Sequence, residues 1–220
     1  MDTSENKKPS VADLRIEYER PKLQRSMLKA DPLEQFKLWL DEAIAANIIE
    51  PHAMTLATAT ASGIPSARTV LLRGYDANGF VFYTNYDSQK GKELAENPYA
   101  ALTFYWATLH RQVRISGSVS RISAIESNHY FQSRPKSSQI GAWASKQSQV
   151  LRSRAELEDE FQEFETEFQD KDVPRPPYWG GFIVSPDMLE FWQGRPSRLH
   201  DRFRYKLQGD GNWLIERLSP

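Results

Sequence analysis

The sequence ARTVLLRGYDANGFVFYT occupies residues 67–84. Its two ends, Ala67–Tyr75 and Phe80–Thr84, are rich in Val, Leu, Phe, Tyr and Thr, which are typical of strands. Between them, Asp76-Ala77-Asn78-Gly79 is a turn sequence. Two extended segments joined by so short a turn pair as an antiparallel hairpin rather than as parts of a βαβ unit. The stretch therefore predicts an antiparallel sheet.

Other extended segments lie on both sides of this hairpin. They are Met54–Thr60, Ala100–Trp106, Gln112–Val119, Gly181–Val184, Met188–Gln193, Phe203–Leu207 and Trp213–Leu218. Turn signals such as Ser62-Gly63 and Gly209-Asp210-Gly211-Asn212 separate neighbouring segments. We expect an α+β protein dominated by an antiparallel sheet that forms a small barrel or meander.

Helices are expected around this sheet. The clearest begins at Asp31-Pro32, with Asp31 as N-cap, and continues with apolar residues at helical spacing: Phe36, Leu40, Ala43 and Ile44. Further helices are predicted for Ser88 to Glu96, Ala124–Ser133 and Ala155–Phe168, the last with an apolar stripe and a strongly acidic face.

Composition limits the classes of function. The 220 residues are 40% hydrophobic, which suits one folded domain over 21–220, preceded by a mobile segment over 1–20. With 28 basic and 29 acidic side chains there is no global field for nucleic acid, and no apolar run reaches transmembrane length. Cysteine is absent, which excludes thiolate nucleophiles and fits a cytoplasmic setting. No common hydrolase, nucleotide-loop or metal motif occurs, so no metal is expected.

Three clusters combine cations with hydroxyl or aromatic groups. Tyr83-Thr84 and Ser88-Gln89-Lys90 place hydroxyls, an ammonium and a helix start together, as a phosphate site requires; a Ser cap beside a solvated Lys is the alternative. Tyr130, Arg134 and Ser138 form a second candidate, unless they are only a basic helix end. Arg68 and Arg73 bracket a strand and point to opposite faces unless a bulge intervenes.

The third cluster is Trp192 followed by Arg198-Leu199-His200-Asp201-Arg202. On a strand, Arg198, His200 and Arg202 would project to one side and Asp201 to the other. Such a face suits a charged aromatic ligand, although a solvated edge strand remains the alternative. Trp192 either stacks on a flat ring or packs in the core.

The order and wording of these segments resemble the pyridoxamine 5′-phosphate oxidase family from about Leu14 to Pro220. The resemblance rests on several long matches: Arg68 to Arg73, Phe82 to Asn85, Arg111-Gln112-Val113, Ser133-Arg134-Pro135, Ser138 to Trp143, Ser145 to Ser148, Trp179 to Phe182, Glu190 to Gly194 and Arg198 to Arg202. It implies an antiparallel split β-barrel with flanking helices that binds FMN at a homodimer interface.

The resemblance also implies residue roles. FMN would be bound by Arg68, Thr69, Val70, Leu71, Leu72, Arg73, Tyr83, Thr84, Gln89, Lys90 and Gln112 of one subunit, completed by Gln147, Ser148, Trp192 and Arg202, chiefly across the dimer. The substrate phosphate would lie among Arg73, Tyr130, Arg134 and Ser138, with Arg198, Leu199 and His200 over the pyridine ring and Arg15 and Tyr18 in a mobile cover. Arg198 and His200 would be the catalytic residues.

The implied reaction is oxidation of pyridoxamine or pyridoxine 5′-phosphate by O₂ to pyridoxal 5′-phosphate and H₂O₂. Two positions depart from the family pattern: Arg73 replaces the usual Lys, and Gln89 replaces a frequent Arg, which removes one cationic contact to the FMN phosphate. Another split-barrel flavin reductase, or a non-catalytic carrier of FMN or pyridoxal phosphate, are the competing hypotheses.

Overall fold

The computed structural model describes residues 10, 11, 14 and 22–220. Its described part contains one curled sheet of nine strands in which every pairing is antiparallel. The strands are β1 (Ala53–Ala59), β2 (Pro65–Leu71), β3 (Gly74–Asp76), β4 (Gly79–Asn85), β5 (Tyr99–Trp106), β6 (Arg111–Arg121), β7 (Trp179–Gln193), β8 (Asp201–Leu207) and β9 (Trp213–Leu218). The predicted α+β class and antiparallel sheet are confirmed.

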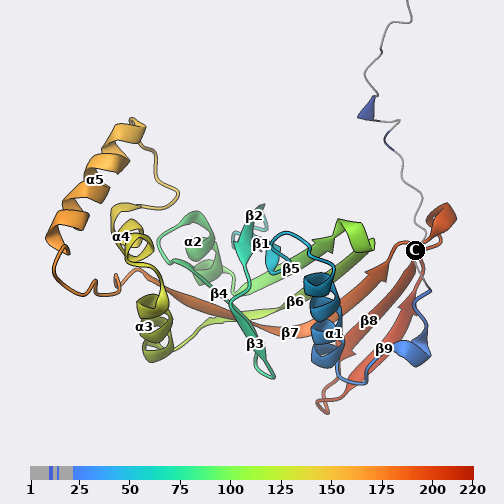
Figure 1. Ribbon diagram of the computed structural model, residues 1–220. Coiled ribbons are helices and arrows are strands. Elements are labelled where there is room, and N and C mark those ends of the chain that lie inside the picture. Colours follow the sequence, from blue (N-terminus) through green and yellow to red (C-terminus); the bar gives the residue numbers. More distant parts are fainter. Residues whose placement is uncertain (1–9, 12–13, 15–21) are drawn as a thin grey trace, which may run out of the picture.

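Five α-helices flank the described sheet (Figure 1). They are α1 (Pro32–Ala45), α2 (Gln89–Glu96), α3 (Ala124–Ser133), α4 (Lys136–Ala144) and α5 (Arg154–Glu167). Asp31 caps α1 by accepting a hydrogen bond from the Leu33 N–H at 2.8 Å, as the sequence predicts. The helices α3, α4 and α5 gather at the end of the sheet away from β8 and β9 (Figure 1).

The long strand β7 organises the sheet. It pairs with β6 along most of its length, while its other edge pairs with β4 from Trp179 to Val184 and with β8 from Met188 to Gln193. The sequence predicts two separate strands here, and this is wrong because the backbone continues through Ser185–Asp187. Ser116 pairs with Met188 and Gly117 with Pro186, so the bulge at this point lies in β7, with Asp187 as the extra residue.

The main core lies between α1 and the sheet. Phe36 and Trp39 of α1 are fully buried or nearly so, and the Phe36 ring meets those of Phe80 and Phe104 at about 5 Å. Ile44, expected on the buried face, is 54% exposed near the end of the helix. A smaller core, centred on Phe131 and Trp179, joins α3 and α4 to β7.

The predicted strand Ala67–Tyr75 is two strands. Leu72 donates to the His52 carbonyl beside β1, whereas Arg73 donates to the Val81 carbonyl of β4. The chain therefore changes partner between these two residues, and β2 ends where β3 begins to form. The helix α4 was not predicted, because its first residues Lys136-Ser137-Ser138 were interpreted as part of a polar cluster and no side chain caps it.

Candidate functional site

A cavity of about 470 Å³ opens between β2, β4, α2 and α3. Its lining is mostly polar and brings together residues that are far apart in the sequence: Arg68, Thr69, Val70, Leu71, Arg73, Tyr83, Thr84, Lys90, Tyr130, Arg134, Gln147 and Trp179. Two of the three clusters recognised in the sequence therefore share one cavity.

The partner change after β2 explains why Arg68 and Arg73 both reach this cavity. A regular strand would direct them to opposite faces, since five positions separate them. The pairing with β1 ends at Leu71, and Arg73 already belongs to the ladder of β4. The interruption does what a bulge would do, and it returns the second arginine to the side of the first.

One end of the cavity, beside the start of α2, is lined by hydrogen-bond donors. The Ser88 side chain caps this helix by accepting from the Gly91 N–H, as predicted. The Lys90 ammonium donates to the Gln147 Oε1 atom at 2.7 Å and to the Thr84 Oγ1 atom at 3.1 Å. Burial, and secondarily the positive charge of Arg68, lower the pKa of Lys90 to about 8. An anion here would relieve the repulsion between the two cations.

The other end of the cavity holds a further cation, Arg134, which has one N–H donor group without an acceptor in the described part of the chain. The Arg134 guanidinium lies 4.7 Å from the centre of the Trp179 ring. Its Nη1 atom is buried and meets no hydrogen-bond acceptor among the described residues. Burial, reinforced by the charge of Arg73, lowers the pKa of Arg134. A buried cation with an unpaired N–H group fits an anionic ligand, which would supply the acceptor.

Stacked aromatic rings form the wall between α3 and the sheet. The Tyr83 and Tyr130 rings stack with centroids 3.9 Å apart, and Trp179 continues the stack 5.4 Å from Tyr83. Burial raises the pKa of Tyr83, so its hydroxyl remains protonated at neutral pH. The three rings are nearly parallel, so they give the cavity a flat aromatic wall.

The third cluster lies at the far end of β7. Trp192 pairs with Gln112 on one side and with Arg202 on the other, and its ring lies 4.7 Å from that of His200. The buried Glu190 carboxylate accepts from Arg202 Nε at 2.9 Å. Gln112 was expected to join Arg68 and Lys90 but lies instead with Trp192, His200 and Arg202, and none of these four residues lines the cavity of Arg68 and Lys90.

The prediction that Arg198, His200 and Arg202 share one strand face is wrong. The strand β8 begins only at Asp201, and Arg198 lies in a 3-10 turn (Pro196–Arg198) with a φ of 61°. Asp201 is buried and accepts from the Leu23 N–H and from Arg217. The His200 Nδ1 atom accepts from the Arg195 N–H at 3.1 Å, and burial, with the Arg198 charge, lowers the pKa of His200.

The remaining candidates are placed as follows. The Gln89 amide donates to Glu93 at 2.9 Å, and its side chain is not part of the cavity lining. Ser138 lies in the first turn of α4, Ser148 is exposed with a φ of 72°, and Leu199 is 70% exposed. Leu72 is buried in the main core, whereas Arg15 and Tyr18 lie outside the described residues.

Two residues near the cavity were not singled out as site residues from the sequence. Trp179 appeared there only within a family motif, although it lines the cavity beside Arg134. Glu93 is buried on α2 and is bonded to Arg68. Its spacing of four positions from Gln89 on a predicted helix was the available signal.

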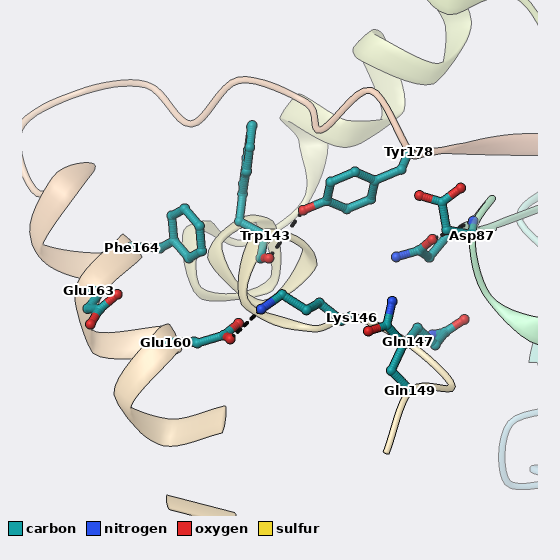
Figure 2. Close-up of a pocket in the computed structure, with 10 residues that line it drawn as sticks. Asp87, Trp143, Lys146, Gln147, Gln149, Glu160, Glu163, Phe164 and Tyr178 are labelled. Carbon is teal, nitrogen blue, oxygen red and sulfur yellow. Dashed lines mark hydrogen bonds and ion pairs between the residues drawn. The ribbon is translucent and has the colours of Figure 1, made fainter. Parts of the chain in front are cut away.

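A second cavity of about 390 Å³ adjoins the first through Gln147 (Figure 2). Trp143 stands between Phe164 and Tyr178, and the Tyr178 hydroxyl donates to the Trp143 carbonyl at 3.2 Å. Lys146 pairs with Glu160 of α5 across the same space at 2.6 Å. The acidic helix α5 therefore packs on α4 and forms one wall of this cavity.

Comparisons with known proteins agree with this architecture. Residues 40–168 match the family described as pyridoxamine 5′-phosphate oxidase, and residues 179–220 match the pyridoxine 5′-phosphate oxidase C-terminal dimerisation region. The pyridoxine/pyridoxamine 5′-phosphate oxidase of Bordetella petrii is 57% identical over 211 residues, which cover 96% of this chain and 100% of that protein.

Two solved structures are similar. PhzG from Burkholderia lata, in complex with tetrahydrophenazine-1-carboxylic acid, has a TM-score of 0.85 and 32% identity over 91% of this chain and 99% of its own. An FMN binding protein from Nostoc punctiforme, related to pyridoxamine 5′-phosphate oxidase, has a TM-score of 0.68 at 16% identity, covering 88% of this chain and 100% of its own, and so shares the fold. Among the described residues, no helix is both long and apolar enough to cross a bilayer. The chain belongs to the pyridoxamine 5′-phosphate oxidase family, a family of oxidoreductases.

Proposed function

We propose that this protein binds FMN and oxidises two substrates to pyridoxal 5′-phosphate: pyridoxamine 5′-phosphate, which consumes O₂ and water and releases ammonia and H₂O₂, and pyridoxine 5′-phosphate, which consumes O₂ and releases H₂O₂. The observation that supports this most is the pairing of two cationic groups in one cavity: Arg68 with Lys90, and Arg73 with Arg134. A reaction between a nucleotide cofactor and a phosphorylated substrate needs two anion sites whose spacing brings the two rings together.

The FMN phosphate is assigned to the end formed by Arg68, Lys90 and Thr84. Two cations, a hydroxyl and the start of α2 give charge-assisted hydrogen bonds to phosphate oxygens. Thr69, Val70 and Leu71 of β2 would border the ring system. The chemistry that bound FMN would supply is acceptance of a hydride from the substrate, followed by transfer of two electrons to O₂.

The substrate phosphate is assigned to Arg73, Tyr130, Arg134 and Ser138. The unmet Nη1 donor of Arg134 favours an acceptor at this place, and the Tyr130 ring, stacked on Tyr83, fixes the position of its hydroxyl. Binding energy gained at the phosphate would hold the reacting carbon still, although the phosphate itself does not react.

A homodimer completes the site in this proposal. The strand β7 has 15 residues, and an extended strand of that length measures about 45–50 Å. Trp179 in the cavity and Trp192 beside His200 lie near its opposite ends. The third cluster of one subunit does not line its own cavity and is assigned to the cavity of the partner. The match of residues 179–220 to a dimerisation region supports this assignment.

Arg198 and His200 are assigned to the substrate. His200 accepts a backbone hydrogen bond at Nδ1 and its pKa is lowered, so the neutral ring is favoured at pH 7. Neutral imidazole and a guanidinium side by side can hold a pyridine ring and its hydroxyl without placing two positive charges together. Both residues orient the reacting carbon in this proposal.

Oxygen uptake on FMN-loaded protein tests the function directly. We expect uptake with both phosphorylated vitamers, formation of pyridoxal 5′-phosphate, and none with the dephosphorylated forms at equal concentration. Yellow protein without oxygen uptake would favour a carrier, and oxidation of a nicotinamide nucleotide in place of the vitamers would favour a flavin reductase.

A further inference from the structure

A buried carboxylate lies directly behind the cationic end of the cavity. Glu93 on α2 is only 5% exposed, and it is not part of the cavity lining. It faces β1 and β2, where Thr58 and Ser66 occupy paired positions of the ladder. A buried carboxylate needs hydrogen bonds or a cation to offset its loss of hydration.

Glu93 is satisfied on both oxygens. Its Oε2 atom accepts from the hydroxyls of Thr58 at 2.5 Å and Ser66 at 2.6 Å, and lies 3.4 Å from Nη2 of Arg68. Its Oε1 atom accepts from the Gln89 amide at 2.9 Å. Burial alone would raise the pKa of Glu93, but two hydroxyls, an amide and a guanidinium lower it to about 2. The group is therefore ionised throughout the physiological range.

The same hydroxyls also bind Arg68. Its Nη1 atom donates to Thr58 Oγ1 and to the Leu56 carbonyl, and its Nη2 atom donates to Ser66 Oγ at 2.5 Å and to Glu93. These four contacts occupy the N–H groups of both Nη atoms, which leaves the charge and the Nε–H group to act on a ligand. The guanidinium is held at one place instead of sampling many rotamers.

We propose that Glu93 is a positioning residue of the cofactor site: through Thr58 and Ser66 it fixes the Arg68 guanidinium where the phosphate of FMN binds. The inference rests on the proposed function, because it assumes that this end of the cavity receives that phosphate. Arranging Arg68 before binding lowers the conformational entropy lost when the ligand arrives.

Glu93 also has an opposite effect on FMN affinity, namely electrostatic repulsion of the phosphate. A carboxylate close to an anion site repels the anion, so removing the carboxylate would tighten FMN binding if this repulsion exceeded the benefit of holding Arg68 in place. Here the carboxylate is already matched by Arg68 and by three hydrogen bonds, and it lies outside the lining. Positioning should therefore outweigh repulsion, and the sign of the change in FMN affinity decides between them.

The test is a titration of full-length, flavin-free protein with FMN and with riboflavin, followed by flavin fluorescence. Riboflavin carries the same ring system but no phosphate. Glu93→Ala should weaken FMN binding by about fivefold to tenfold, the cost of ordering one long side chain, and should leave riboflavin binding within about twofold. Glu93→Gln, which keeps the shape, should change FMN binding in the same direction by less. Glu96→Gln, an exposed position of the same helix, is the control for charge.

A double variant makes the test specific. If Glu93 acts through Arg68, then Glu93→Ala should have almost no further effect on FMN affinity when Arg68→Ala is already present. Equal losses for FMN and riboflavin, or unchanged or tighter FMN binding by Glu93→Ala and Glu93→Gln, would overturn the inference while the proposed function stands. If the unaltered protein does not bind FMN, the proposed function fails and the inference fails with it. Should Glu93→Ala not fold by circular dichroism, Glu93→Gln alone carries the comparison.

Discussion

The Tyr130 ring of α3 lies on the Tyr83 ring of β4, with centroids 3.9 Å apart and planes 17° from parallel. This contact joins the helix that carries the proposed substrate clamp to the strand that carries the proposed cofactor site. It gives Tyr130 two separable properties, a ring that packs on Tyr83 and a hydroxyl that is proposed to bind the substrate phosphate.

Variants of Tyr130 should separate those properties. Tyr130→Phe should keep the stack and leave the melting temperature within about 1 °C, while KM for the phosphorylated vitamers rises because one hydrogen bond to phosphate is lost. Tyr130→Ala should in addition lower the free energy of unfolding by about 1–3 kcal/mol. Thermal melts and steady-state kinetics measure the two effects. A large loss of stability in Tyr130→Phe would contradict this division.

Arg134 should contribute nothing to the stability of the ligand-free protein, or lower it slightly, and should strengthen binding of the phosphorylated substrate. Its guanidinium is half-buried with an unmet donor, so Arg134→Met should leave the unliganded protein as stable as before or slightly more stable. The same change should raise KM for pyridoxamine 5′-phosphate by at least about tenfold, since a charge-assisted hydrogen bond is lost. Chemical denaturation without ligand, alongside kinetics, tests both; a clear loss of stability would show that Arg134 is structural.

The affinity for FMN should fall as pH rises through about 8. The pKa of Lys90 in the ligand-free protein is lowered to about 8, so above that pH the site loses one positive charge before the phosphate arrives. Phosphate binding favours the ammonium, and protons are therefore taken up on binding in this range. Fluorescence titrations between about pH 7 and pH 9 should show the decline. Lys90→Arg, which stays charged, should show a smaller decline of FMN affinity with pH. An equal decline in both proteins would contradict the assignment of Lys90 to the FMN phosphate.

Arg198→Ala should reduce turnover far more than FMN content. Arg198 is exposed and lies in the 3-10 turn beside His200, whose pKa it lowers. Removing the cation should raise the pKa of His200, so the neutral ring is reached only at higher pH and the acid side of the rate profile moves upward. Kinetics across pH, with flavin absorbance for cofactor content, measure this. Turnover equal to that of the unaltered protein would refute the role.

Gly117 should be intolerant of any side chain. A Cβ atom built there would lie 1.9 Å from the carbonyl oxygen of Ser185, beside the bulge in β7. We expect Gly117→Ala to lower the free energy of unfolding by about 2–4 kcal/mol, because backbone must move. Ser118→Ala, at the next and exposed position, should change it by less than about 0.5 kcal/mol. Urea denaturation of both variants provides the comparison.

Much of the fold follows from local sequence. The strand runs, the N-caps Asp31 and Ser88 and the turn before Gly79 predict most element boundaries to within about two residues, because local hydrogen bonding and side-chain patterning determine them. The joining of two predicted strands into β7, and the division of another into β2 and β3, depend on which strand lies alongside. Which strands pair with each other is a non-local property, so the periodicity of the sequence does not predict it.

The candidate site was predictable in part for the same reason. Clusters near one another in sequence, such as Thr84 with Lys90 or Tyr130 with Arg134, could be recognised from spacing and from the family resemblance. The meeting of Arg68 with Glu93 depends on α2 packing behind β1 and β2. The geometry at Arg198 depends on a turn with positive φ at two non-glycine residues, which strand periodicity does not reveal.

The length of the single strand β7 sets a distance within the molecule. Its first half pairs with β4 and its second half with β8, so the number of residues between the two halves determines how far apart two chemically different surfaces lie. Hairpin tips such as residues 76–79 and 209–212 can accept insertions without disturbing that distance. One residue added within β7 would turn over the faces of everything beyond it. Changes of length in this protein should therefore accumulate at its hairpins and be excluded from its longest strand.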